Sequence, residues 1–347
     1  MNELSLNDLR EDIKQIRNYL KYIQSLDEVI DSLSYNVNSK AKQFFRFSRI
    51  EKKRFEYKAL IISLYGLTEK FIESCIREYL DSLSSLIPRY EMISDKIKSS
   101  HYDLSIKLIS LLSSRENSKY QDLNRDEVLI NLSNCLNGSE QYKLNIEAFF
   151  ILSGNLKHTK IVELFRNLDI DLNSELSKNS TFCTKLELPS NRINNIEKDV
   201  LYGKLNDLVQ RRNQIAHGFE VDNILDASEI EPFVKFLEAY FQAIFDILVY
   251  KFIDQEKRYN FQRIDTIIDI YNNQVLAFEI ENYILKVGDF IIIENKERNL
   301  SEKKRILEIQ SLNQSYLELE VNDRKKVAIR VDPKIKKNHI FYLAKQN

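Results

Sequence analysis

Apolar residues recur every three or four positions through most of the first 254 residues, which is the spacing of one face of a helix. The longest stripe of this kind lies in residues 54–86, and Pro88 marks its end because a proline disfavours helix in the residue before it. We therefore predict an all-α domain over residues 1–254. Its other helices are expected at 6–23, 28–34, 91–112, 160–167, 194–217 and 228–253.

Two polar stretches interrupt this pattern. Residues 114–142, with an Asn137–Gly138 pair typical of a turn, are interpreted as an insertion. Residues 169–189 are interpreted as a polar connector without helix. His158, between the two, is expected to be an ordinary polar residue of a loop, with a place along the RNA path as the alternative.

The last two predicted helices carry end signals. Gly218 is expected to cap the first of them at its C-terminus, because glycine tolerates the left-handed conformation. Ser228 and Glu231 have the S-x-x-E spacing of a capping box at the start of the second, with Pro232 in its first turn.

After residue 255 the period of the apolar residues shortens to two, and β-branched and aromatic residues become frequent. Asn272–Asn273 and Asn322–Asp323 are expected turns. Seven short strands in residues 255–347 predict a small β barrel or sandwich, and the whole chain is α+β in two domains. The strands are expected at 264–271, 275–280, 289–294, 305–309, 316–321, 327–331 and 340–343.

Composition excludes several classes of function. The chain has 51 Lys and Arg against 52 Asp and Glu, so affinity for nucleic acid must come from local patches. Its three cysteines and four histidines are dispersed, which predicts no disulfide framework and no metal site. No glycine-rich phosphate loop occurs, so no cofactor is expected. No apolar run has membrane length and no leader peptide is evident, so a cytoplasmic protein is expected.

The segment before Gly218 carries the chemistry. Arg212 lies near the middle of an apolar helical arc, where a charge is costly unless it is paired or functional. Asn213 and His217 are four residues apart and share one face beside it. A snorkelling arginine and a histidine that caps a helix end are the structural alternatives.

Arg212-Asn213-x-x-x-His217 resembles the R-polar-x-x-x-H signature of the HEPN superfamily (higher eukaryotes and prokaryotes nucleotide-binding domain). The setting is similar too, because the motif ends a long helix, Gly218 follows, and one further helix closes the domain. Residues 57–88 resemble an early core helix of the bacterial defence and toxin branch. The resemblance covers roughly residues 1–254.

The resemblance implies metal-independent RNA cleavage by a homodimer, in which two copies of the motif form one site. His217 would then act as general base or acid toward the ribose 2′-hydroxyl. Arg212 would hold the phosphate, and Asn213 would orient the histidine or a phosphate oxygen. An antitoxin or another defence-system protein is an implied partner. A HEPN scaffold that only binds RNA or docks on a partner is the non-enzymatic alternative.

One position departs from part of the family. Some members that pair with a nucleotidyltransferase antitoxin carry a modified tyrosine two residues after the histidine. Here that position is Phe219, which has no hydroxyl group. Control by that route would need another tyrosine, such as Tyr202.

Two basic stretches are candidate RNA-binding segments. Residues 40–58 interleave cations with phenylalanines, and residues 324–337 hold seven cations against Asp332 and the preceding Asp323. A charged helix face and a lysine-protected strand edge are the structural alternatives. The candidate RNA-binding residues are Arg46, Arg49, Lys52, Lys53, Lys325, Lys326, Lys336 and Lys337.

Overall fold

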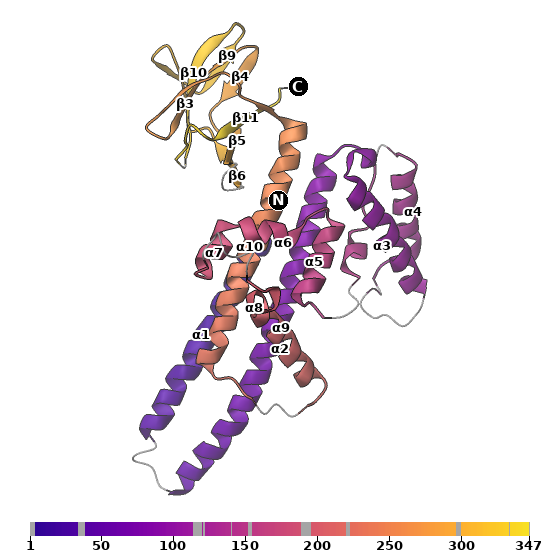
Figure 1. Ribbon diagram of the computed structural model, residues 1–347, viewed down its shortest axis with the longest axis vertical. Coiled ribbons are helices and arrows are strands. Elements are labelled where there is room, and N and C mark those ends of the chain that lie inside the picture. The colour runs from indigo at the N-terminus through magenta and orange to yellow at the C-terminus, as the bar shows by residue number, and fades with distance from the viewer. Residues whose placement is uncertain are drawn as a thin grey trace. The chain divides into compact units, whose positions relative to one another are not determined.

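The computed structural model divides the chain into two compact units (Figure 1). One comprises residues 1–84 and 88–245, and the other comprises residues 85–87 and 246–347. Helices make up the first unit and strands dominate the second, so the predicted α+β organisation in two parts is confirmed in outline. The described residues are 4–33, 39–113, 120, 122–139, 141–151, 155–188, 196–219, 223–295, 300–332 and 334–346, with only the backbone described for 33, 39–47 and 300.

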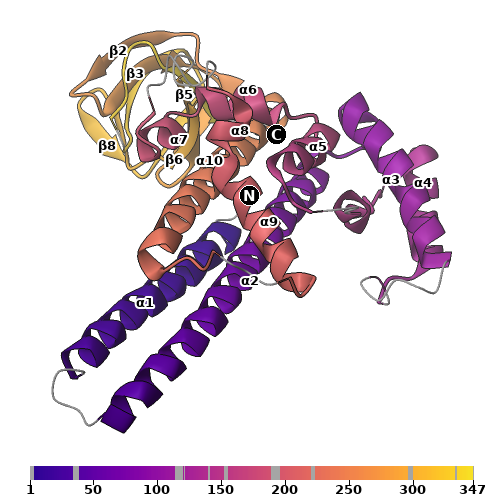
Figure 2. The same ribbon diagram turned by 60° about the horizontal axis from the view of Figure 1, so that its bottom comes forward.

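Two long helices form a hairpin in the helical unit (Figures 1 and 2). The segments predicted at 6–23 and 28–34 are one helix, α1 (Leu4–Leu33). The next helix, α2 (Ser39–Leu86), begins earlier than predicted and ends two residues before Pro88, as expected. Its apolar stripe lies in the core, where Ile61, Leu64 and Ile72 are fully buried.

Both polar stretches contain helices, so the interpretation of residues 169–189 as a connector without helix is wrong. Asx caps start the helices: Asn124, Asp171 and Asn179 each accept a backbone N–H through the side chain. Buried apolar residues such as Phe182 then hold the helices in place, although their average composition is polar. The elements of this region are η1 (Tyr90–Met92), α3 (Asp95–Ser113), α4 (Arg125–Leu136), η3 (Ile146–Phe150), α5 (His158–Asn167), α6 (Leu172–Lys178) and α7 (Ser180–Lys185).

The helix predicted at 194–217 is broken at Tyr202 into α8 (Lys198–Leu201) and α9 (Gly203–Ala216). Tyr202 leaves the helical conformation (φ −102°, ψ 13°) and is buried. Its ring stacks on the imidazole of His158, with ring centroids 3.3 Å apart. Packing of two rings therefore overrides the helical periodicity of the sequence.

The prediction that His158 is a loop residue is wrong. It is the first residue of α5 and is 3% exposed. Its Nδ1 lies 2.8 Å from the Tyr240 hydroxyl, and its Nε2 lies 2.9 Å from Oδ1 of Asn173. Because Oδ1 accepts only, Nε2 carries the proton and Nδ1 accepts from the tyrosine. Burial lowers the pKa of His158 to about 4. His158 is therefore a neutral core residue.

His101 on α3 is a second neutral core histidine. Its Nε2 accepts a hydrogen bond from the backbone N–H of Asn145 (2.9 Å), and its Nδ1 lies 3.1 Å from the Tyr90 hydroxyl. Burial lowers the pKa of His101 to about 4 as well. Neither imidazole can take up a proton without losing a hydrogen bond that it accepts.

Acid should therefore weaken the helical unit through these two histidines. In the unfolded chain each takes up a proton near pH 6.5, whereas the folded protein resists protonation until about pH 4. The free energy of unfolding is thus fully retained above about pH 6.5 and falls as the pH drops toward 4. We expect a loss of about 1.4 kcal/mol per histidine for each pH unit in this window.

Urea unfolding at pH 7, 6 and 5 measures this loss. Because carboxylates titrate in the same range, the informative quantity is the difference between wild type and the His101→Gln or His158→Gln variant at each pH. Each variant should be less stable at pH 7 and should lose less on acidification. A difference that stays constant from pH 7 to pH 5 would contradict the prediction.

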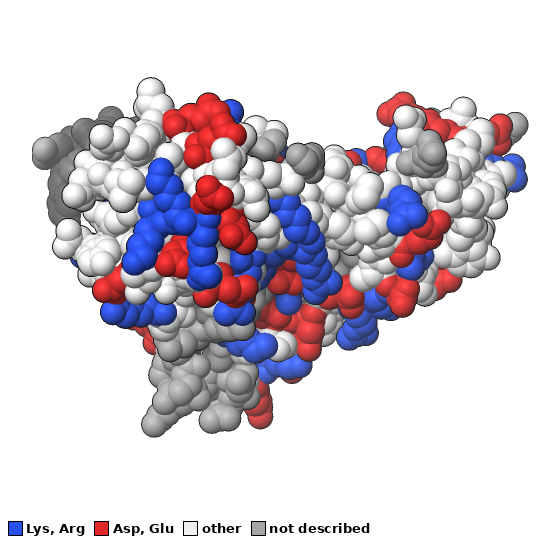
Figure 3. Space-filling view, turned by 90° about the horizontal axis from the view of Figure 1, so that it is seen from above, with Lys and Arg blue, Asp and Glu red and all other residues white. Residues whose placement is uncertain are grey.

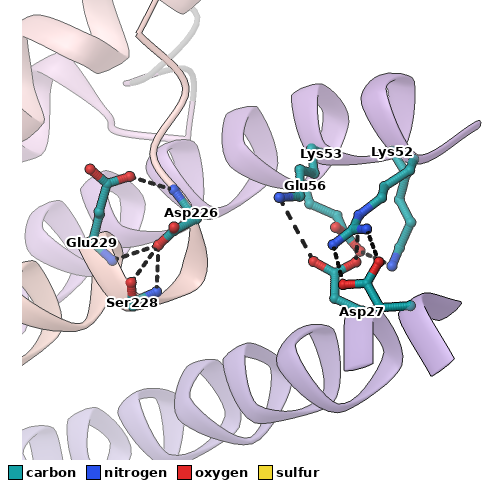
Figure 4. Close-up of polar contacts among 9 residues, drawn as sticks. Asp27, Lys52, Lys53, Glu56, Asp226, Ser228 and Glu229 are labelled. Atoms are coloured by element: carbon teal, nitrogen blue, oxygen red, sulfur yellow. Dashed lines mark hydrogen bonds and ion pairs between the residues drawn. The ribbon is translucent and has the colours of Figure 1, made fainter. Parts of the chain in front are cut away.

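The capping box predicted at Ser228 and Glu231 is wrong, because the last helix, α10 (Ala227–Asn260), is capped by Asp226 (Figure 4). Oδ1 of Asp226 accepts from the backbone N–H groups of Ser228 (2.9 Å) and Glu229 (3.0 Å). Glu229 accepts in return from the Asp226 N–H (2.9 Å). Glu231 instead forms an ion pair with Arg17 (2.9 Å).

The second unit contains more strands than predicted. In its described residues they form three antiparallel sheets, with the orders β1-β11-β5-β6, β2-β3-β10-β7-β8 and β4-β9, and no closed barrel. Asn272 and Asn273, both with positive φ, make the predicted turn between β2 and β3. The strands are β1 (Phe261–Arg263), β2 (Ile267–Tyr271), β3 (Val275–Ile280), β4 (Tyr283–Lys286), β5 (Phe290–Asn295), β6 (Leu300–Arg305), β7 (Glu308–Ser311), β8 (Gln314–Tyr316), β9 (Glu318–Val321), β10 (Lys325–Arg330) and β11 (Ile340–Ala344).

One apolar core holds the three sheets together, and it includes Phe278, Leu285 and Phe341. The last part of α10 belongs to this unit and extends past the predicted end at residue 253. Its Ile253 packs against Phe261 and Ile292. Ion pairs border this region of packing, at Lys257–Glu294 (3.2 Å) and Glu256–Lys303 (2.6 Å).

Candidate active site on helix α9

Helix α9 is anchored in the core by Leu205, Leu208 and Val209, all fully buried. Its last turns carry two arginines in succession, Arg211 and Arg212, which face different neighbours. The partners of these two side chains differ, and the difference distinguishes a structural cation from one that is available for chemistry.

Arg211 is bound within the fold by a carboxylate, a hydroxyl and a backbone carbonyl. Its Nε donates to both carboxylate oxygens of Asp207 (3.1 Å each). Its Nη1 donates to the Tyr57 hydroxyl (2.9 Å) and to the backbone carbonyl of Asn223 (3.1 Å). Arg211 therefore ties α9 to α2 and to the segment that precedes α10.

Arg212 has neutral partners instead. Its Nη1 donates to Oδ1 of Asn213 (3.2 Å) and, over a longer distance, to Oδ1 of Asn155 (3.4 Å). Its guanidinium lies over the ring of Tyr65, 4.4 Å from Cζ to the ring centroid. Among the described residues, no carboxylate lies within 4 Å of Arg212, and its Nε and Nη2 have no acceptor. The side chain is half-buried.

His217 follows the helix as its C-cap. Gly218 adopts φ +71°, and the backbone N–H groups of Gly218 and Phe219 donate to the carbonyls of Ile215 (3.2 Å) and Gln214 (3.0 Å). This is a Schellman motif, and it confirms Gly218 as the predicted C-terminal cap. The imidazole of His217 is exposed beside Phe219, whose side chain is 64% exposed, with ring centroids 6.2 Å apart.

The motif residues therefore share one end of α9, as their spacing predicts. Asn213 contacts Arg212 through its side chain and His217 only through its backbone carbonyl, which accepts the His217 N–H (3.0 Å). In the described residues, Asn213 thus orients the arginine and not the imidazole. Tyr65 and Asn155 complete the surroundings of Arg212 and have no counterpart in the sequence motif.

A family model described as RiboL-PSP-HEPN matches residues 7–250. The chain belongs to this family. No curated protein matches the chain significantly. The matched range runs from α1 into α10 and contains Arg212 and His217. The HEPN resemblance stated for roughly residues 1–254 is therefore confirmed over residues 7–250. The sheets of the second unit lie outside the matched range.

Three further observations concern the described residues of the RiboL-PSP-HEPN segment and of the strands after it. Across the described ranges, no three His, Cys, Asp or Glu side chains gather where they could share a metal ion. None of the described helices has the length and apolar character needed to span a membrane. The cysteines at 75, 135 and 183 are buried and unlinked.

The first basic stretch of the RiboL-PSP-HEPN segment is neutralised within the α1–α2 hairpin. Arg49 pairs with Asp27 (3.4 Å) and Asp31, Lys53 lies 3.9 Å from Asp27, and Lys52 lies 3.4 Å from the buried Glu56 (Figure 4). The side chain of Arg46 lies outside the described residues. The structure thus brings three of the four candidates together, but with carboxylates that compete with RNA phosphates.

The second basic stretch follows β10 and the turn before β11. Lys337 pairs with Asp269 (2.8 Å), whereas Lys326 and Lys336 are exposed and Lys325 is half-buried. On the face shown in Figure 3, basic and acidic side chains are interspersed. Within the described part of the chain, the side chains of Lys325, Lys326 and Lys336 make no ion pair. These three remain candidates for binding RNA.

Replacing Lys325, Lys326, Lys336 and Lys337 with alanine tests the second stretch. If these lysines neutralise phosphates, the slope of log affinity against log salt should decrease by about 0.7 for each phosphate of a single-stranded RNA that is no longer neutralised. Fluorescence anisotropy with a labelled RNA measures that slope between roughly 50 and 200 mM salt, where electrostatic binding weakens steeply. An unchanged slope would assign the lysines to strand-edge protection.

Proposed function

We propose that this member of the RiboL-PSP-HEPN family is a metal-independent endoribonuclease whose catalytic residues are Arg212, Asn213 and His217. The observation that carries the proposal is the contrast between adjacent arginines. Arg211 is bound by a carboxylate, whereas Arg212 is held by amides and a ring, and an exposed histidine follows at the end of the same helix. A cation held without a counter-charge is suited to a phosphate.

The reaction would use the RNA's own nucleophile. His217 takes the proton of a ribose 2′-hydroxyl, a bond forms between O2′ and phosphorus, and the bond from phosphorus to O5′ breaks. The departing O5′ receives a proton from a second imidazole. Arg212 and the amide of Asn213 hold the non-bridging oxygens as negative charge develops on them. The products are a 2′,3′-cyclic phosphate and a 5′-hydroxyl end.

Two proton transfers explain why we propose a homodimer. A single copy of the motif supplies one histidine, and the second imidazole would be the partner's His217 across a two-fold axis. Light scattering at micromolar concentration should then report a dimer. A monomer that is fully active at the same concentration would rule out the composite site.

The test of the proposed function uses RNA and DNA of the same sequence. Cleavage of the RNA should continue in excess EDTA, because no step needs a metal ion, and the DNA should remain intact, because it lacks the 2′-hydroxyl. Loss of activity in EDTA that added Mg²⁺ restores, or equal cleavage of DNA, would show that the mechanism is wrong.

A non-catalytic HEPN scaffold is the second candidate, and one observation favours it. A catalytic histidine usually has a hydrogen-bond partner that selects its tautomer. Within the described residues, the imidazole of His217 has none. A scaffold would bind RNA or a protein through the same end of α9 without cutting. For the ribonuclease, we propose a cytoplasmic role in defence or as a toxin, with an antitoxin or defence-system protein as partner.

A further inference from the structure

We propose that Tyr65 and Asn155 are positioning residues that form a neutral clamp on Arg212. The clamp, made of the Tyr65 ring and the Asn155 and Asn213 amides, would orient the guanidinium toward an RNA phosphate without neutralising its charge. The inference rests on the proposed function, because it assigns Arg212 a phosphate to bind.

The Tyr65 ring is the floor of the clamp. Tyr65 lies on α2 and is 3% exposed, so packing fixes its position. The Arg212 Cζ atom lies 4.4 Å from the ring centroid, within the range of a cation–π interaction. The ring therefore attracts the guanidinium and restricts it to one plane, but it leaves the net positive charge unchanged.

The Tyr65 hydroxyl also holds the second part of the clamp. It accepts a hydrogen bond from the backbone N–H of Leu156 (3.3 Å), and Leu156 is fully buried. The carboxylate of Glu69, on the next turn of α2, also hydrogen-bonds this hydroxyl but makes no ion pair with Arg212 among the described residues. The preceding residue is Asn155, whose Oδ1 accepts from Nη1 of Arg212 (3.4 Å). One side chain of α2 thus contacts Arg212 directly and fixes the segment that supplies its amide partner.

Both acceptors of Nη1, the side chains of Asn155 and Asn213, are uncharged amides. Both hydrogen bonds fall on one corner of the guanidinium, and the edge formed by Nε and Nη2 has no acceptor among the described residues. A carboxylate at residue 155 would hold Arg212 equally well, yet it would cancel the charge that attracts a phosphate. Arg211, with Asp207 as its partner, shows the alternative arrangement one residue away.

The substitution Asn155→Asp separates positioning from charge, because it preserves shape and adds one negative charge. We expect it to weaken binding of a non-cleavable 2′-O-methyl RNA about tenfold, the loss of roughly one charge-assisted hydrogen bond. Asn155→Ala should have a smaller effect. Asn18→Asp, an exposed position on α1, is the matched control for the added charge.

Tyr65 is tested in the same way. Tyr65→Leu removes the ring and should weaken RNA binding, whereas Tyr65→Phe keeps the ring and should bind more tightly than Tyr65→Leu. Urea unfolding identifies any variant that fails to fold, and the two tyrosine variants are compared only if both are folded. Asn155→Asp does not depend on that condition, because it preserves the volume of the side chain.

Binding and cleavage together keep the two proposals apart. Weaker RNA binding by Asn155→Asp than by Asn155→Ala supports the clamp, even if the wild type never cuts RNA and the proposed ribonuclease is wrong. Equal binding by Asn155→Asp and wild type would overturn the clamp while leaving cleavage to be judged by itself. A wild-type protein that neither binds nor cuts RNA would overturn both.

Discussion

His217→Ala should reduce RNA cleavage by about 10²–10⁴-fold, the usual cost of losing a general acid–base group. The effect should fall on catalysis and not on folding. The His217 ring is exposed and makes no hydrogen bond to the described residues, so its removal leaves no buried group unsatisfied. Single-turnover cleavage of a labelled RNA measures the reduction.

The matched control for this variant is Gln214→Ala. Gln214 is exposed on the last turn of α9 and contributes its backbone carbonyl to the Schellman motif, which the substitution preserves. It should cut RNA at nearly the wild-type rate. If both variants cut RNA at the wild-type rate, His217 would be a helix cap only, and the role proposed for it in the cleavage would be wrong.

Substitution of the adjacent arginines should separate chemistry from stability. Arg212→Ala should lower cleavage by about 10²-fold or more, because it removes the cation that stabilises the transition state. Arg211→Ala should instead destabilise the fold by roughly 2 kcal/mol, because it removes charged hydrogen bonds that join α9 to α2. Urea unfolding and cleavage are measured on both variants.

The two outcomes form a crossed pattern. Arg212→Ala should unfold near the urea concentration that unfolds the wild type, and it should cut little RNA. Arg211→Ala should unfold at a lower urea concentration, but it should cut RNA under conditions in which it is folded. An Arg212→Ala protein that unfolds as early as Arg211→Ala would mean that Arg212 is a structural residue. Its loss of cleavage would then say nothing about chemistry.

The long helices could be predicted from apolar periodicity, since a regular stripe is sufficient to place α2 and most of α10. Their ends could not always be predicted. Asp226, and not Ser228, caps α10, and both residues have the required acidic residue three positions later. The local backbone conformation decides which of the two possible capping pairs forms.

Tertiary packing explains the remaining differences. Tyr202 ends a helix because its ring stacks on His158, a residue far from it in the sequence. Strand β6 (Leu300–Arg305) is mostly polar and charged, and pairing with the apolar β5 makes it a strand. Neither interaction has a local signal that a sequence pattern could detect.

The candidate site divides in the same way. The motif from Arg212 to His217 is contiguous, so the sequence places its members on one helix end. Tyr65 and Asn155 reach Arg212 only because α2 and the segment before α5 pack against α9. A tyrosine in an apolar stripe and an asparagine in a polar segment are common, and nothing in the sequence marks them as neighbours of the arginine.

The most direct test of the proposed chemistry follows a single phosphodiester bond. An RNA oligonucleotide that the wild type cuts at a known position is compared, in EDTA, with a copy that has one 2′-deoxy residue on the 5′ side of that bond. We predict a 2′,3′-cyclic phosphate at the cut in the all-RNA strand, and no cut at that bond in the deoxy-substituted strand. Equal cleavage of the bond in both strands would contradict attack by the 2′-hydroxyl and, with it, the role proposed for His217.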